Sequence, residues 1–240
     1  YSLISYQTAY LKAHYPVEFL CAVMSLDITN TEKLLLYKEE CKKMGFEVLK
    51  PDINKSGADF AVEDGNIRYA LGAIKGVGAA NMQAIEDERR AHGPYKDLSD
   101  FIHRTDIKQI NRRQMEQLAK AGAFDCLDKN RGKIFANIET IMQHIAAASE
   151  LKTSSQASLF GTEELHTTVK LADKPDWPEL EKLKLEAEAV GFYLSAHPLD
   201  SYARGMERLG VKTAVEVFHN IKVGDTIRAK LAGCVNSVQK

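Results

Sequence analysis

The stretch AIKGVGAAN, residues 73–81, places one glycine on each side of a valine, directly before a helical pattern. Glycine permits positive φ and leaves backbone N–H groups uncovered. A helix that begins at about Ala79 adds more unpaired N–H groups and the positive end of its dipole. We therefore expect the turn to seat one phosphate, with Lys75 beside it. Ile74 and Val77 are expected to hold the turn in the core.

Several known motifs share part of this pattern. A dinucleotide-binding fingerprint requires a third glycine and a βαβ unit, whereas residues 76–81 read GVGAAN and follow a hairpin strand. A Walker A loop requires Gly-Lys followed by Ser or Thr, which this stretch lacks. A purely structural corner between two helices stays open as an alternative. The form hydrophobic-x-Gly-hydrophobic-Gly resembles the helix-hairpin-helix motif, which binds the backbone of duplex DNA without reading bases, and we prefer this interpretation. It assigns DNA contact to Ile74, Lys75, Gly76, Val77, Gly78, Ala79 and Asn81.

A second, degenerate copy of the motif follows within RTDIKQINRRQ, residues 104–114. Ile107 and Ile110 stand at its apolar positions. Gln109 and Asn111 replace the glycines, and asparagine tolerates the left-handed conformation, so the turn can still form. Its candidate DNA contacts are Lys108, Asn111, Arg112 and Arg113. As an alternative, these basic residues form the solvated face of a helix.

On both sides of these turns, apolar periodicity predicts a mainly α protein with one small β-hairpin. Asp64-Gly65 lies between two apolar-rich runs, which is typical of a type I′ turn. Asn30 or Thr31 can cap a helix that Gly45 ends. Besides the helix that Gly45 ends, the expected helices span residues 2–14, 16–26, 79–92, 98–103, 112–120, 133–151 and 177–193. Strands are expected at 46–49, on both sides of the Asp64-Gly65 turn, and within 224–238.

The composition is that of a folded protein with an uneven charge. Of 240 residues, 45% are hydrophobic and 27% charged, which is enough to bury real cores. The formal net charge of −1 argues against binding nucleic acid by bulk charge alone. Residues 67–120 hold ten Lys/Arg against seven Asp/Glu, whereas residues 150–200 hold five against ten. The first segment could therefore face phosphate while the second faces a different partner.

The cysteines and the hydropathy indicate a cytoplasmic protein. Cys21, Cys41, Cys126 and Cys234 are widely spaced and form no CxxC pair. This spacing indicates neither a zinc site nor a disulfide framework, and it fits reduced thiols. No signal peptide and no apolar run of ~20 residues is present, so no membrane association is expected. The chain starts inside a helical pattern and ends in a strand-like run, which is typical of a piece of a longer protein.

Several motifs occur in an order that is typical of one protein family. They are LISYQTAYLKAHYPVEF (3–19), PDIN (51–54), RYALGAIKGVG (68–78), INRRQMEQLAKAGAFD (110–125) and GFYLSAHPLD (191–200). Together they cover nearly the whole chain, and they resemble the alpha subunits of bacterial DNA polymerase III, the replicative C-family polymerases. The resemblance implies four parts: the end of the fingers domain (1–50), the hairpin and a tandem helix-hairpin-helix DNA-binding domain (51–150), a clamp-binding loop with following helices (151–210), and the start of an OB domain (211–240).

SSQASLFG, residues 154–161, interrupts the apolar periodicity with an adjacent Leu-Phe pair. In the family that the chain resembles, a short loop after the helix-hairpin-helix domain docks on the sliding clamp through a pattern like Gln-x-x-Leu-Phe. The resemblance therefore assigns clamp binding to Gln156, Ala157, Ser158, Leu159 and Phe160. Two large apolar side chains on a loop can enter a pocket that a helix would not reach, and the Gln156 amide offers hydrogen bonds at its edge. The alternative is that Leu159 and Phe160 cover a small satellite core.

No catalytic residue is expected in this chain. It holds no Asp-x-Asp pair of the kind that binds two Mg²⁺ ions in a polymerase. The run EDERR, residues 86–90, lies in mid-helix and predicts an exposed, ion-paired face. We therefore expect no metal site and no cofactor here. The resemblance places the Mg²⁺-binding carboxylates of the parent DNA-directed DNA polymerase upstream of Tyr1.

Two functions stay open at this point. The preferred one is a segment of the replicative polymerase that binds duplex backbone without sequence preference and tethers the enzyme to the sliding clamp for processive synthesis. Its partners would be the primer-template duplex, the clamp and, through other parts of the parent, further replicase subunits. The alternative is an independent helix-hairpin-helix module of DNA repair or recombination without clamp contact. Such a module would have no need of residues 1–19 and 191–200.

Overall fold

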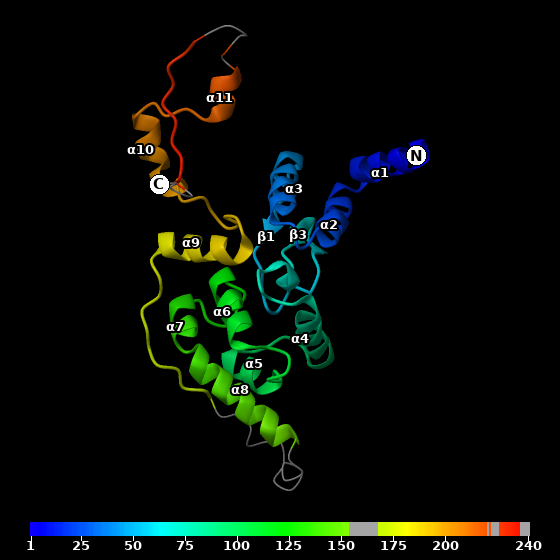
Figure 1. Ribbon diagram of the computed structural model, residues 1–240, viewed down its shortest axis with the longest axis vertical. Helices are drawn as coiled ribbons and strands as arrows, with labels where there is room; N and C mark the ends of the chain where they lie inside the picture. Colours follow the sequence, from blue (N-terminus) through cyan, green and yellow to red (C-terminus); the bar gives the residue numbers. More distant parts are fainter. Residues whose placement is uncertain (154–167, 220, 222–225, 236–240) are drawn as a thin grey trace, which may run out of the picture. The chain divides into compact units, whose positions relative to one another are not determined.

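The computed structural model describes residues 1–153, 168–219, 221 and 226–235 of the 240-residue chain. The chain divides into two compact units, Tyr1–Ser195 and Ala196–Lys240 (Figure 1). The first, called the N-terminal unit below, holds both predicted DNA-binding turns and the buried core of the described residues. The predicted fold class, mainly α with a small sheet, is confirmed.

Three helices open the N-terminal unit, and their ends follow the local sequence. They are α1 (Ser2–His14), α2 (Pro16–Leu26) and α3 (Thr31–Met44). Pro16 stands at the first position of α2, where its missing N–H loses no helical hydrogen bond. The Asn30 side chain accepts from the N–H of Lys33 at 3.1 Å, and Gly45 ends α3 with φ 89°. α1 and α2 have the predicted bounds, and α3 is capped by Asn30, one of the two predicted caps, and ends at the predicted glycine.

A small three-stranded sheet follows α3. Its strands are β1 (Val48–Leu49), β2 (Ala61–Glu63) and β3 (Asn66–Arg68), in the order β1-β3-β2. β1 runs parallel to β3, and β2 runs antiparallel to it. Asp64 and Gly65 join β2 to β3 with φ values of 50° and 74°, as a type I′ turn requires. The predicted hairpin is confirmed, and β1 forms only the second half of the predicted run 46–49.

The rest of the N-terminal unit is helical. A 3-10 turn, η1 (Leu71–Ala73), leads into α4 (Ala79–His92), α5 (Leu98–Arg104), α6 (Arg112–Ala121), α7 (Arg131–Ala136), α8 (Ile138–Thr153) and α9 (Glu179–Val190). Helix α6 packs against α7, α8 and α9, and α5 packs against α8 (Figure 1). Helix α4 packs back on η1, so residues 71–92 form a compact helix-turn-helix.

The single helix predicted over 133–151 is in fact two, because Asn137 interrupts it. The Asn137 side chain donates to the carbonyl of Ala172 at 2.9 Å and accepts from the N–H of Ala172 at 2.9 Å. At Asn137 the backbone leaves helical geometry, with ψ 12°. The predicted apolar face is nevertheless buried as a whole and consists of Ile134, Ile138, Ile141 and Ile145. Periodicity therefore identified the buried face but not the break, which depends on a partner far along the chain.

Helix α9 ends earlier than the predicted position near Tyr193. Gly191 adopts φ 104° and stops the helix after Val190. The Glu186 carboxylate then accepts hydrogen bonds from the N–H groups of Leu194 and Ser195, at 3.1 and 2.8 Å. The chain after Gly191 consequently folds back onto α9.

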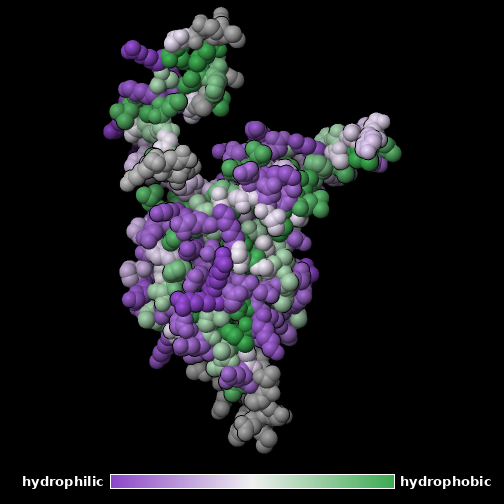
Figure 2. Space-filling model, in the orientation of Figure 1, coloured by the Kyte–Doolittle hydropathy of each residue, from purple (hydrophilic) through white to green (hydrophobic). Residues whose placement is uncertain are grey.

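Two groups of packed aromatic rings support the core of the N-terminal unit. Tyr69 contacts Phe60 and Phe192 edge to face. The second group consists of Tyr95, Phe101 and Phe124. Edge-to-face pairs of this kind add to the stability that burial alone provides. In the view of Figure 2, hydrophilic side chains cover the region of α6 and α9.

The C-terminal unit contains η4 (Asp200–Tyr202), α10 (Ala203–Arg208) and α11 (Ala214–His219). In its described residues, Val211 and Lys230 form an isolated parallel bridge. The strand predicted within 224–238 is not formed over the described residues 226–235. A single bridge does not supply the row of neighbouring backbone groups that a strand requires. The predicted domain boundaries at residues 50, 150 and 210 stay predictions.

Candidate nucleic-acid interface

The first glycine turn is held in the N-terminal unit by its two apolar residues. Ile74 is 1% exposed and Val77 is 5% exposed, and the N–H of Val77 donates to the Ile74 carbonyl at 3.0 Å. Gly76, between them, has φ 76°, which favours glycine. Lys75 and Gly78 are exposed, as is Gly76. The buried residues thus fix the turn, and the exposed ones are presented to solvent.

Backbone N–H groups at this turn are open. Gly78 is the N-cap of α4, and no side chain caps this helix. The N–H groups of Gly76, Gly78 and Ala79 make no hydrogen bond to any residue that the structure describes. Open N–H groups at the positive end of a helix dipole attract anions. Residues 74–79 therefore have an arrangement that suits an anion, and Asn81 lies half-buried in the first turn of α4.

The run EDERR, residues 86–90, is ion-paired as the sequence predicts, since Arg90 pairs with Glu86, but it is exposed only in part. Glu86 is buried, and its carboxylate accepts from the N–H of Ala58 at 2.9 Å. Arg89 donates to the carbonyls of Ile53 and Ser56, at 2.6 and 2.7 Å. Burial lowers the pKa of the Arg89 guanidinium. The loop at 53–58 forms no helix or strand, so these two side chains of α4 satisfy its backbone groups.

The second turn is capped in a way that differs from the prediction. Asn111 has φ −114°, not a left-handed value, and it is the N-cap of α6. Its side chain accepts from the N–H of Gln114 at 3.0 Å, and the Gln114 side chain accepts from the N–H of Asn111 at 2.9 Å. This capping box explains why asparagine stands where the first turn has glycine. The second turn thus forms without the left-handed conformation that asparagine tolerates.

Protein groups also occupy the N–H donors inside the second turn. The Asp106 carboxylate accepts from the N–H of Lys108 at 2.8 Å, and the Gln109 side chain accepts from the N–H of Asp106 at 3.0 Å. The N–H of Gln109 donates to the Asp106 carbonyl at 2.9 Å. The N–H of Ile107 donates to the Ser149 hydroxyl in α8 at 3.0 Å. At the positions equivalent to Gly76 and Gly78, the N–H groups of Gln109 and Asn111 thus have protein acceptors, whereas those of the two glycines have none in the described part of the chain.

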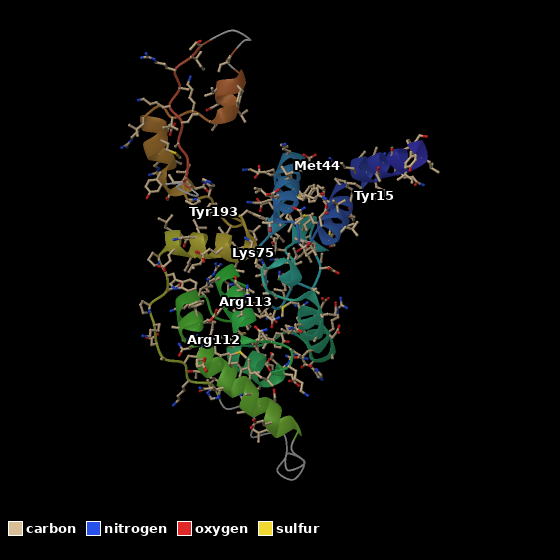
Figure 3. All side chains as sticks on the ribbon, in the orientation of Figure 1. Tyr15, Met44, Lys75, Arg112, Arg113 and Tyr193 are labelled. Atoms are coloured by element: carbon tan, nitrogen blue, oxygen red, sulfur yellow. The ribbon has the colours of Figure 1, made fainter. Side chains whose placement is uncertain are left out.

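The two turns lie against each other. A Cβ added at Gly76 would lie 3.2 Å from Nε of Arg113, and one added at Gly78 would lie 3.8 Å from the side-chain nitrogen of Gln114. The Arg113 guanidinium therefore lies over the first turn, although Arg113 belongs to the second. Figure 3 shows Lys75 and Arg113 in the region where α9 and α6 meet. We call this area the hairpin surface; it consists of Lys75, Gly76, Gly78, Ala79 and Arg113.

The basic residues predicted for DNA contact differ in their partners. Lys75 and Arg113 form no ion pair with any residue in the described ranges. Arg112, in contrast, pairs with Glu116 and Glu139, each at 3.0 Å. The exposed Lys108 belongs to the second turn, whose N–H groups are occupied. Arg113 lies over the open N–H groups, and Lys75 directly precedes Gly76 in the chain, with its Nζ 3.1 Å from the place that a Cβ on Gly191 would occupy.

A buried ion-pair network fixes α9 next to α6. The Arg131 guanidinium donates to both carboxylate oxygens of Asp125, at 2.8 and 2.6 Å, and lies 3.6 Å from the Glu186 carboxylate of α9. Burial alone would lower the pKa of this guanidinium, but the hydrogen bonds and charges of Asp125 and Glu186 raise it above its ordinary value. The end of α9 also holds the first turn, since the N–H of Lys75 donates to the Ala189 carbonyl at 2.9 Å. The network therefore positions the hairpin surface.

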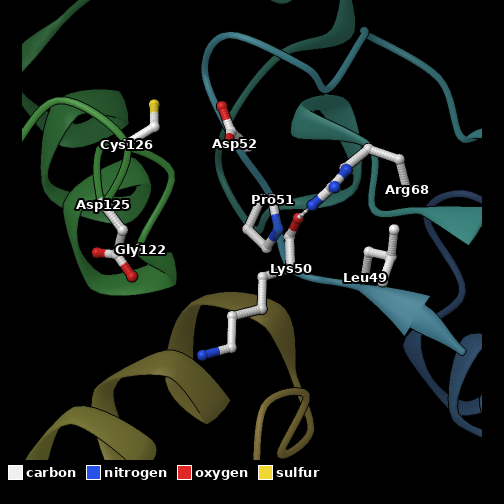
Figure 4. A pocket seen from close by; sticks show the side chains of 8 residues that line it. All are labelled: Leu49, Lys50, Pro51, Asp52, Arg68, Gly122, Asp125 and Cys126. Atoms are coloured by element: carbon white, nitrogen blue, oxygen red, sulfur yellow. Dashed lines mark hydrogen bonds between the residues drawn. The ribbon is translucent and has the colours of Figure 1, made fainter. Parts of the chain in front are cut away.

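A separate pocket of about 310 Å³ lies beside β1 (Figure 4). It is lined by Leu49, Lys50, Pro51, Asp52, Arg68, Gly122, Asp125 and Cys126. Arg68 donates to the Lys50 carbonyl at 2.6 Å, and Asp125 is held by Arg131. Cys126 is an exposed residue, but partial desolvation of its thiol and a hydrogen bond to Asp52 raise the pKa of the thiol to about 12, so the thiol stays protonated at neutral pH. Arg68 and Asp125, two of the lining side chains, are thus held by hydrogen bonds within the protein.

The predicted clamp-binding residues lie outside the described residues; they are Gln156, Ala157, Ser158, Leu159 and Phe160. On one side of them, the Ser149 hydroxyl accepts from the second turn at Ile107. On the other side, the N–H of Val169 donates to the Ser99 hydroxyl of α5 at 3.0 Å. The chain that flanks the predicted clamp-binding residues is thus attached to the same domain that carries the two turns.

The comparisons with known proteins agree with this geometry. Residues 45–134, which include both turns, match the family described as helix-hairpin-helix motif. The chain is 40% identical over 224 residues to DNA polymerase III subunit alpha of Caulobacter vibrioides (strain NA1000 / CB15N), which is 93% of the chain and 20% of that protein. It is 42% identical over 241 residues to the same subunit of Neisseria meningitidis serogroup A, covering 100% of the chain and 20% of the relative. For Escherichia coli (strain K12) the identity is 38%, over 95% of the chain and 20% of the relative.

None of the helices in the described part of the chain has the length and apolar character needed to cross a membrane. The chain spans about one fifth of the length of the curated relatives it matches. The resemblance that its motifs indicate is confirmed: over 93–100% of its length the chain is similar to a segment of DNA polymerase III subunit alpha, and it contains a match to the helix-hairpin-helix motif.

Proposed function

We propose that this chain binds the phosphate backbone of duplex DNA through the hairpin surface, as part of a replicative DNA polymerase. The observation that carries the proposal is the open first turn, where the N–H groups of Gly76, Gly78 and Ala79 follow Lys75 in the chain and lie beside the Arg113 guanidinium. The match of both turns to the helix-hairpin-helix family supports the same ligand. The natural substrate is the primer-template duplex.

The chemistry of this surface is suited to backbone contact rather than base reading. Backbone N–H groups and an ammonium group donate to phosphate oxygens, which every nucleotide carries. Such contacts release counterions, so affinity falls as salt concentration rises. With a net charge of −1 on the whole chain, the intrinsic affinity is expected to be weak.

Reversing the charge of Lys75 tests the proposal. Lys75→Glu should weaken duplex binding by about tenfold, and equally on two duplexes of unrelated sequence, because it places a carboxylate beside the phosphate. The measurement is fluorescence anisotropy with labelled duplexes at several salt concentrations.

Lys42→Glu provides the matched control, since it changes the charge of the chain by the same amount. Thr31 and Lys75 both adjoin Gly191, and Lys42 lies eleven residues beyond Thr31 along α3, which is about 16 Å. The control should bind duplex almost as well as the unaltered chain. If both variants lost duplex affinity equally, or if Lys75→Glu lost affinity for only one of the two duplex sequences, Lys75 would not be a phosphate contact.

We also propose that residues 156–160 dock on the sliding clamp. Support comes from the sequence QASLF, which fits a Gln-x-x-Leu-Phe pattern, and from the family to which the matched segment corresponds. The flanking residues Ser149 and Val169 bond to the domain that carries the hairpin surface. When one chain contacts both the clamp and the duplex, each contact raises the effective concentration for the other, so two weak contacts together bind more tightly than either alone. Loss of the clamp contact should therefore shorten each synthesis run rather than slow each addition.

The polymerase reaction itself is proposed for the longer parent protein, with its Mg²⁺ ions held outside this chain. The sequence of the chain contains no Asp-x-Asp pair for two metal ions. Contacts with other replicase subunits and a cytoplasmic location follow from the same proposal. An independent DNA repair module without clamp contact is disfavoured by the relatives, which match residues over 93–100% of the chain, far beyond the motif at 45–134.

A further inference from the structure

The two turns of the tandem motif are chemically unequal. In the first, the N–H groups of Gly76, Gly78 and Ala79 have no acceptor among the described residues. In the second, the equivalent N–H groups of Gln109 and Asn111 donate to Asp106 and Gln114, and of the three counterparts only Arg112, which stands in the place of Ala79, has no acceptor among the described residues. A pair of equivalent phosphate seats, one in each turn, therefore does not fit this protein.

We propose that the two turns build a single phosphate seat, in which the second turn supplies Arg113 and binds no phosphate of its own. The inference deepens the proposed function and rests on it. It assigns to the second turn the role of placing a guanidinium over the first.

The position of Arg113 supports this assignment. Its Nε lies 3.2 Å, and its Cζ 3.6 Å, from the place that a Cβ on Gly76 would occupy. Arg113 forms no ion pair with a described residue, and it stands in the first turn of α6, where no acidic residue accompanies it. A cation at the positive end of a helix dipole is unfavourable, and a bound anion would relieve that cost. The planar guanidinium can donate two parallel hydrogen bonds to a phosphate.

The second turn also carries a charge of the wrong sign for a phosphate. The Asp106 carboxylate lies within the turn and accepts from the N–H of Lys108 at 2.8 Å. A phosphate at this position would meet a carboxylate and would have to displace it from the N–H group. The first turn contains no acidic residue at the corresponding place, which Ala73 occupies.

Gly76 then serves two purposes. Its φ of 76° forms the turn, and its missing side chain leaves room for Arg113. Gln109 stands at the corresponding place in the second turn and has no positive φ. The difference between glycine and glutamine thus marks which turn holds the phosphate.

The test compares equivalent lysines, because Lys75 and Lys108 occupy the same position in the two turns. Duplex affinity of the full 240-residue chain is measured for Lys75→Ala, Arg113→Ala, Lys108→Ala and the double variant Lys75→Ala/Arg113→Ala, at several salt concentrations. All three side chains are exposed, so the variants should keep the melting temperature of the unaltered chain. Lys42→Ala serves as the control.

With one shared seat, Lys75→Ala and Arg113→Ala should each weaken binding by about tenfold, and Lys108→Ala by no more than about twofold. The double variant should lower the salt slope by about one phosphate contact, roughly 0.9. Two results would contradict the single seat without contradicting duplex binding. One is a loss of affinity for Lys108→Ala as large as that for Lys75→Ala. The other is a salt slope of the double variant that is lower by the amount expected for two phosphate contacts. If the unaltered chain bound no duplex at any salt concentration, the proposed function would fail and the inference with it.

Discussion

Replacing Arg131 with methionine is expected to lower the free energy of unfolding by about 3–5 kcal/mol. The Arg131 side chain is 6% exposed and lies between the carboxylates of Asp125 and Glu186. Methionine has a similar length but no charge, so the variant leaves Glu186, which is 1% exposed, as a buried carboxylate without its cation. Breaking one side of a buried ion pair is costly for this reason, even where the pair as a whole adds little.

Thermal melting followed by circular dichroism measures this effect, which corresponds to a fall of about 10 °C or more in the melting temperature of a chain of this size. Arg112→Met is the matched control, because Arg112 also pairs with two carboxylates, those of Glu116 and Glu139, but its side chain is 66% exposed. Exposed pairs contribute about 0–1 kcal/mol. Similar melting temperatures for the two variants would show that the Arg131 network does not stabilise α9 against α6.

The second large effect concerns the sliding clamp. If residues 156–160 are a clamp ligand, Phe160→Ala should weaken clamp binding by at least about tenfold, because a few anchors carry most of the energy of such an interface. The melting temperature should stay nearly unchanged, since the proposed role of Phe160 lies in the complex. The measurement pairs clamp binding, by surface plasmon resonance, with thermal melting of the same protein.

Thr162→Ala, two positions beyond Phe160, gives a control outside the proposed pentapeptide. It should bind the clamp like the unaltered chain. A lower melting temperature for Phe160→Ala with unchanged clamp affinity would contradict clamp binding. It would support the alternative interpretation, in which Leu159 and Phe160 cover a satellite core.

Local signals in the sequence predicted most of the fold. The Asn30 cap, the Gly45 stop and the Asp64-Gly65 turn each act within a few residues, and each is where the sequence indicates. The apolar residues of the first turn, Ile74 and Val77, are buried as expected. These features follow from backbone preferences and periodicity, which neighbouring residues decide.

The features that the sequence did not predict depend on partners far along the chain. Asn137 breaks a helix because it bonds to Ala172, and Glu86 is buried because it satisfies the N–H of Ala58. The position of Arg113 over Gly76 is of the same kind, since 37 residues separate them and only tertiary packing brings them together. The tandem motif predicts DNA contact for both Gly76 and Arg113, but it does not indicate that the two residues lie next to each other.

The capping of Asn111 illustrates a different limit. Asparagine favours both the left-handed conformation and the N-cap position, and composition alone does not choose between them. Gln114, three residues later, completes a capping box, which favours the N-cap conformation at Asn111. That pattern was present in the sequence and would have predicted the observed backbone.

The most direct test of the phosphate seat is a titration of the ¹⁵N-labelled chain with a short duplex, followed by the NMR shifts of individual N–H groups. The account predicts large shifts at the backbone N–H groups of Gly76, Gly78 and Ala79 and at Nε of Arg113, because these donors would bond to phosphate oxygens. The N–H groups of Gln109 and Asn111 in the second turn should shift little, since protein groups already occupy them. Duplex binding that left the first turn unshifted, or that shifted the second turn instead, would contradict the account.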